Sequence, residues 1–78
     1  MVKIKNIKKE NDRIFCDIYV EDCKVPMKTI LCDDETYEID DFPNGYDWCK
    51  THVRYALRFL KTLFNEKDVP TQKTIMWY

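Results

Sequence analysis

Residues 48–65 carry an apolar stripe with the spacing of an α-helix, and this stripe restricts the folds open to the chain. Intervals of three and four residues place its members on one face of a 3.6-residue helix. They are Cys49, Val53, Ala56, Leu57, Leu60, Leu63 and Phe64. Asp47 is suited to cap the first turn, and Pro70 lies just beyond the last. We expect one amphipathic helix over residues 48–65 that packs against another layer.

The first part of the chain alternates like a β-hairpin. Residues 2–8 and 13–20 are two predicted strands, joined at Asn11 and Asp12, which tolerate the left-handed backbone of a tight turn. The second strand is expected to bury Ile14, Cys16, Ile18 and Val20. Phe15 and Tyr19 then lie on the opposite face, where they are covered by another element or form an exposed aromatic strip.

Three more segments are predicted strands. They are residues 25–32, with Pro26 restricted to the strand start or a sheet edge, residues 36–39, and residues 73–78. Residues 41–47 contain Pro, Asn and the single Gly and should break the sheet. The expected fold is α+β: an antiparallel β-meander of four to five strands packed against one amphipathic helix, with the C-terminal strand returning to the sheet.

The length of 78 residues fits a single domain over residues 1–78. A hydrophobic share of 45% and a net charge of −1 are typical of chains that fold. A domain of this size buries only about 60% of the surface of its unfolded chain. It therefore gains stability from association, and we expect a homo-oligomer.

The chain is expected to be cytoplasmic and without a membrane partner. It opens without the apolar stretch of about 7 to 15 residues typical of a signal peptide, and no run approaches the ~20 apolar residues of a membrane span. The four cysteines, at 16, 23, 32 and 49, should therefore stay reduced. No two of them have zinc-finger spacing, so we expect neither metal nor cofactor.

The composition excludes most catalytic constellations. The chain has no serine, one glycine and one histidine, so a serine triad or a glycine-rich phosphate loop cannot be built. Cys49 and His52 are three residues apart on the predicted helix and could touch, which leaves a small nucleotide-handling enzyme as an alternative. Because Cys49 belongs to the apolar stripe and no third group orients the pair, we expect no catalytic residues.

Charge is divided sharply along the chain. Residues 33–47 hold seven acids and no base, whereas residues 48–65 hold four bases and no acid. The four bases form one stripe, Lys50, Arg54, Arg58 and Lys61, flanked by Trp48, His52, Tyr55 and Phe59. Arginine beside aromatic rings is suited to an anionic, planar partner. The alternative is a solvated basic face, neutralised by the acidic segment.

The overall charge and the residues at the end of the chain bear on the expected partner. A net charge of −1 and a pI of 5.7 are not those of a duplex nucleic-acid binder. An anionic, nucleotide-like small molecule or an acidic protein surface remains. The terminal Met76, Trp77 and Tyr78 either pack on the sheet or anchor a homodimer or partner interface. The candidate binding residues are Trp48, Lys50, His52, Arg54, Tyr55, Arg58, Lys61, Trp77 and Tyr78.

Three strings, IKNIKKENDRIFCDIYVED, TYEI and VPTQKTIMWY, resemble a group of small uncharacterised proteins of Firmicutes and their mobile elements. The ending TIMWY is the most distinctive part. The resemblance implies the same layout of hairpin, meander and helix, but no activity. Because small orphan proteins are frequent on phages, it also implies an accessory protein that counters host defence. We expect a non-enzymatic binding protein that sequesters a ligand or blocks a protein surface, or else a purely structural oligomer subunit.

Overall fold

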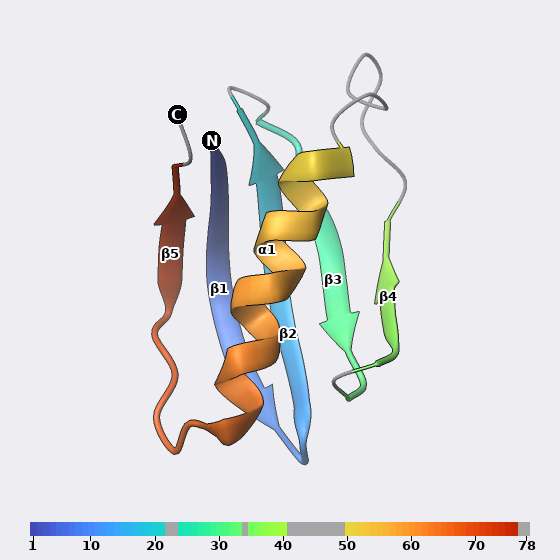
Figure 1. Ribbon diagram of the computed structural model, residues 1–78, viewed down its shortest axis with the longest axis vertical. Helices are drawn as coiled ribbons and strands as arrows, with labels where there is room; N and C mark the ends of the chain where they lie inside the picture. Colours follow the sequence, from blue (N-terminus) through green and yellow to red (C-terminus); the bar gives the residue numbers. More distant parts are fainter. Residues whose placement is uncertain (22–23, 34, 41–49, 77–78) are drawn as a thin grey trace.

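One five-stranded antiparallel sheet and one helix make up the fold (Figure 1). The computed structural model describes residues 1–21, 24–33, 35–40 and 50–76. The strands are β1 (Val2–Glu10), β2 (Arg13–Val20), β3 (Met27–Leu31), β4 (Tyr37–Ile39) and β5 (Gln72–Ile75). The helix α1 (Lys50–Thr62) continues into a 3₁₀ turn, η1 (Leu63–Asn65). This architecture confirms the predicted α+β fold.

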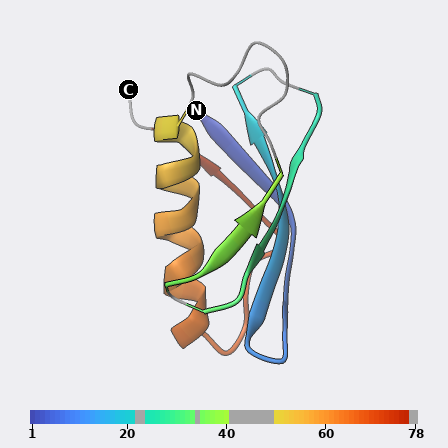
Figure 2. The ribbon, with the colours of Figure 1, turned by 90° about the vertical axis from the view of Figure 1, so that its right-hand side faces the viewer.

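The sheet order is β4-β3-β2-β1-β5. The first four strands form the predicted meander, and β5 returns to pair with β1 on the far side of the hairpin. Figure 2 shows α1 along one face of the sheet, while no element of the described chain covers the other face. Phe15 and Tyr19 lie half-buried on that uncovered face, so no described layer packs over them.

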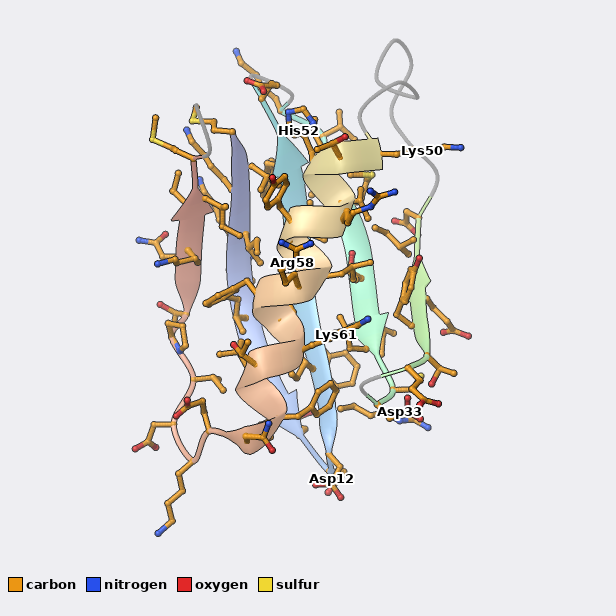
Figure 3. The ribbon with its side chains drawn as sticks, in the orientation of Figure 1. Asp12, Asp33, Lys50, His52, Arg58 and Lys61 are labelled. Carbon is orange, nitrogen blue, oxygen red and sulfur yellow. The ribbon has the colours of Figure 1, made fainter. Side chains whose placement is uncertain are left out.

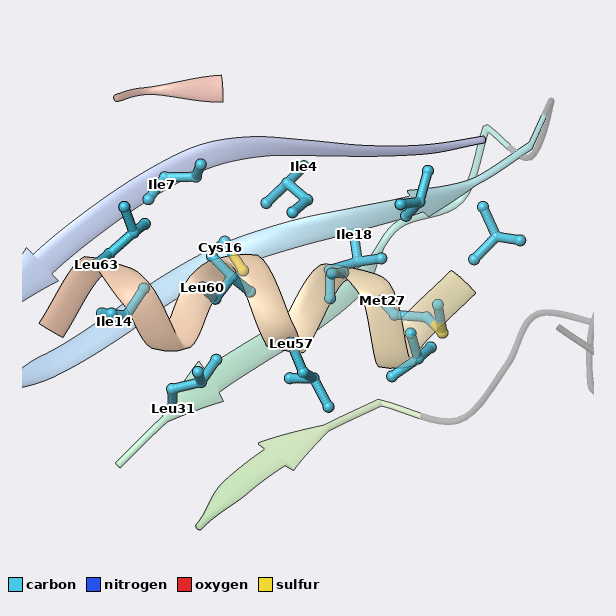
Figure 4. Packing of buried hydrophobic residues seen from close by; sticks show 14 residues of the cluster. Ile4, Ile7, Ile14, Cys16, Ile18, Met27, Leu31, Leu57, Leu60 and Leu63 are labelled. Carbon is cyan, nitrogen blue, oxygen red and sulfur yellow. The ribbon is translucent and has the colours of Figure 1, made fainter. Parts of the chain in front are cut away.

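The core lies between α1 and the sheet (Figure 4). The side chains predicted for the inner face of β2 are all buried, which confirms that pattern. So are five members of the helical stripe, Val53, Ala56, Leu57, Leu60 and Leu63, with Phe64 packed at their edge. Cys49 and Asp47 lie outside the described residues. The helical segment ends at Asn65, as the sequence predicts.

The β1–β2 hairpin contains a bulge that alternation did not predict. Asn11 and Asp12 have φ of 48° and 64°, which confirms the predicted turn. The register then shifts between Lys5 and Lys8, where Asn6 also has a positive φ of 56°. The extra residue turns Ile7 into the core, where it is 5% exposed.

The remaining strands are shorter than predicted. Met27 begins β3 directly after Pro26, which has no N–H for the ladder. Strand β5 covers Gln72–Ile75, and Met76 beyond it is 64% exposed. Trp77 and Tyr78 lie outside the described residues. Within the described part of the chain, no helix has the length and apolar character that crossing a bilayer requires.

Candidate functional site

A groove of about 750 Å³ runs between α1 and the β3–β4 side of the sheet. Its floor is apolar and comes from both layers: Met27, Ile39, Val53 and Leu57. Met27 and Leu57 belong to the buried core, so the groove is an opening in the helix–sheet interface rather than a surface dimple. Ile39 packs at the core edge.

One wall of the groove is cationic. Lys50, Arg54, Arg58 and Lys61 all line it. Their spacing of four, four and three residues places them on one flank of α1, beside the stripe that faces the sheet. Figure 3 shows Lys50 and Lys61 toward opposite ends of the helix, with Arg58 between them. None of the four forms a salt bridge with any residue that the structure describes.

The other wall comes from β4 and the residue after it. Tyr37 and Ile39 face the helix because their strand partners, Leu31 and Thr29, lie on the buried face of β3. The ring of Tyr37 remains 45% exposed at the groove.

Asp40 is the single acid among the described lining residues. The Lys28 backbone N–H donates to Asp40 Oδ2 at 3.2 Å, and the Asp40 N–H donates to the Lys28 carbonyl at 3.1 Å. The paired strands therefore hold the Asp40 carboxylate in place.

His52, which the sequence predicted to flank the cationic stripe, is buried and does not line the groove. Its side chain is 7% exposed, and its Nε2 lies 2.5 Å from Oε1 of Glu21, the residue that follows β2. The same oxygen lies 2.7 Å from the Met1 amino group. The bond to His52, followed by the bond to the amino group, lowers the pKa of Glu21 to about 2. His52 therefore links α1 to the sheet and is not a groove residue.

The remaining predicted site residues fall into two groups. Tyr55 does not line the groove, but the Arg58 guanidinium carbon sits 5.5 Å from the centre of its ring. Trp48, Trp77 and Tyr78 lie outside the described residues. The structure thus brings all four predicted cations into one groove and adds Tyr37 and Asp40, which sequence reasoning missed. The alternation of TYEI placed Tyr37 and Ile39 on one face, but nothing local placed that face against the helix.

The alternative of a Cys49–His52 catalytic pair stays a prediction, because Cys49 is not among the described residues. Burial, with a smaller effect of Asp17, raises the pKa of the Cys16 thiol to about 12, so that cysteine is a core residue. Among the residues that the structure describes, no cluster of three His, Cys, Asp or Glu side chains could hold a metal ion.

Comparison with protein-family models, curated proteins and solved structures finds no match for this chain. The resemblance to the Firmicutes group therefore stays a prediction, and the chemistry of the groove is the available guide to function.

Proposed function

We propose that the chain is a small, non-enzymatic binding protein that holds an anionic, nucleotide-like ligand in the groove between α1 and β4. The observation that carries this proposal is the convergence of four cationic side chains on an apolar floor opposite Tyr37. Guanidinium groups bind phosphate through paired hydrogen bonds, and a tyrosine ring offers a stacking surface for a base.

The geometry favours a binding role over a merely solvated basic face. Cations on low-dielectric walls concentrate the field in the space between them, which raises the local concentration of anions. A volume of about 750 Å³ falls within the range of about 300–1,000 Å³ typical of small-molecule sites. A concave site of this size suits a small ligand better than a flat acidic protein surface.

Sequestration is the simplest mechanism for such a protein. A non-enzymatic protein can withhold a nucleotide-like ligand from another protein by mass action. That mode of action suits an accessory protein of a phage or mobile element that counters host defence, the role implied by the resemblance. Homo-oligomer formation and a cytoplasmic location remain expectations.

The test is calorimetric titration with ATP as the probe, using the double variant Arg54→Glu and Arg58→Glu. Because charge-assisted hydrogen bonds to phosphate contribute most of such affinity, we expect the dissociation constant to rise by at least about 10-fold. Circular dichroism should show an unchanged fold, since both side chains lie on the groove wall.

The matched control is Lys24→Glu with Lys67→Glu. Both lysines are exposed, neither lines the groove, and the net charge changes by the same amount. The control should bind ATP within about twofold of the parent chain, with the small difference due to long-range screening. Equal affinity in the folded groove variant and the control contradicts the proposal.

A further inference from the structure

We infer, on the basis of the proposed function, that the groove accepts a short single-stranded oligonucleotide in preference to a mononucleotide. Phosphates would follow the cations of α1, and bases would face β4. The inference rests on the length of the cationic row and on two different base-binding positions along the opposite wall.

The cationic row is longer than the phosphate cluster of a mononucleotide. Lys50 and Lys61 are eleven positions apart, which is about 16.5 Å at 1.5 Å per residue of α-helix. Successive phosphates of one duplex strand already lie about 3.4 Å apart along the axis, and an extended strand spaces them further. Neighbouring phosphates of ATP are joined through a single bridging oxygen, so they lie closer together than the phosphates of a nucleic-acid strand, which are separated by sugars. A ligand whose phosphates are spaced by sugars reaches both ends of the row.

The opposite wall has an aromatic end and an acidic end. Across the sheet, Tyr37 pairs with Leu31 on β3, and Leu31 pairs with Ile14 on β2. Ile14 in turn pairs with Lys9 on β1. The Lys9 ammonium donates to the Leu63 carbonyl, at the end of the helical segment, at 3.1 Å. Tyr37 therefore lies at the Lys61 end of the groove. Strand β4 runs from there toward the first turn of α1 (Figure 1), so Asp40 lies toward Lys50.

These two groups suit different parts of a nucleic-acid strand. Tyr37 can stack on the face of any base. Asp40 Oδ2 accepts the Lys28 N–H. The other carboxylate oxygen, Oδ1, repels phosphate but is suited to accept a hydrogen bond from the amino group of a base, as carboxylates do from cytosine. The two residues are three positions apart, about 10 Å in an extended strand. One base cannot occupy both positions, so a ligand that uses both has at least two nucleotides.

The test is titration of the full chain with two probes that both contain adenine and three phosphates, the trinucleotide pApApA and ATP. We expect the trinucleotide to bind at least about 10-fold more tightly. The plot of log K against log salt should have a slope of about −2, which corresponds to about 0.7 for each of three phosphates on a single strand.

Variants at the two ends of the groove locate the ligand. Lys50→Gln and Lys61→Gln should each weaken pApApA several-fold, whereas only one of them should affect ATP. Tyr37→Leu should weaken pApApA about 10-fold because stacking is lost, and Tyr37→Phe, which keeps the ring, should not.

Hexaglutamate is the control for a linear polyanion without bases. If it matches pApApA, an acidic peptide is the better partner and the inference is overturned. ATP binding as tight as the trinucleotide, with dependence on Arg54 and Arg58, overturns the inference but leaves the proposed function standing. Absence of binding by all three probes removes both.

Discussion

At the scale of single residues, the side chain of Glu21 contacts groups from two distant parts of the chain. Its carboxylate oxygen Oε1 contacts both His52 Nε2 and the Met1 amino group. Its backbone has a positive φ of 50°, and its N–H donates to the Met1 carbonyl at 3.0 Å. One residue at the end of β2 thus joins α1 to the start of β1.

This pairing predicts acid sensitivity. The folded pKa of Glu21 is about 2, below the ordinary value of 4.5, so folding favours the ionised form. The contribution of ionised Glu21 to the free energy of unfolding is present above about pH 4.5 and is lost as the pH falls toward 2. In Glu21→Gln, the free energy of unfolding should fall less steeply than in the parent chain across this interval, as measured by urea denaturation at several pH values.

Glu38→Gln is the control, because Glu38 is exposed on the uncovered face of the sheet. Its pH dependence should follow that of the parent chain. If Glu21→Gln and the parent chain lose stability in parallel between pH 4.5 and 2, the contacts of Glu21 do not stabilise the fold.

At the scale of elements, the bulge in β1 decides which side chains enter the core. Asn6 adopts a left-handed backbone conformation, and its side-chain Nδ2 donates to Oδ2 of Asp17 on β2 at 2.8 Å. Asparagine is one of the few residues other than glycine that tolerates this conformation. Without the extra residue, strict alternation from Ile4 would bury Asn6 and expose Ile7.

Asn6→Val should destabilise the protein by about 1–2 kcal/mol, since a β-branched residue disfavours the left-handed backbone. Asn6→Gly keeps that conformation accessible and should cost less. The measurement is chemical denaturation followed by circular dichroism. Lys5→Val, at the neighbouring exposed position with ordinary strand pairing, should change the free energy of unfolding little. Equal losses at positions 5 and 6 would show that the bulge needs no special residue.

At the scale of the whole molecule, Lys9 connects the sheet to the end of the helical segment. Its ammonium donates to the carbonyls of Leu63, Phe64 and Glu66 at 3.1, 2.9 and 2.9 Å. The last carbonyls of a helix have no intrahelical donor, and a cation there also interacts favourably with the helix dipole. One side chain of β1 thus supplies hydrogen-bond donors to carbonyls at the end of the helical segment.

Lys9→Met keeps most of the side-chain volume but removes these donors. We expect the free energy of unfolding to fall by roughly 1.5–3 kcal/mol, the contribution of hydrogen bonds to a charged group. Thermal and urea denaturation measure the change. Lys8→Met is the matched control, because among the described residues the Lys8 ammonium forms one ion pair, with exposed Glu10 at 3.0 Å. Its loss should cost less than about 1 kcal/mol. Similar losses at both positions would contradict the role of Lys9.

The candidate site was predictable in part for a physical reason. Lys50, Arg54, Arg58 and Lys61 share a flank of α1 because helix geometry relates residues that are near in sequence. That this flank lines a groove with β4 was not predicted. The burial of His52 was not predictable, because its partner Glu21 lies 31 positions away. Tyr37 and Asp40 were missed because a three-residue strand leaves its neighbours unspecified.

Element types and the inner faces of β2 and α1 followed from the sequence alone, since periods of 2 and 3.6 residues and the chemistry of turns act over a few neighbouring positions. Three features were decided by the tertiary structure: the pairing of β5 with β1, the bulge at Asn6 and the groove between α1 and β4. Each depends on which elements from distant parts of the chain pack together. That choice is set by the shape and burial of the complete core, which no local pattern contains.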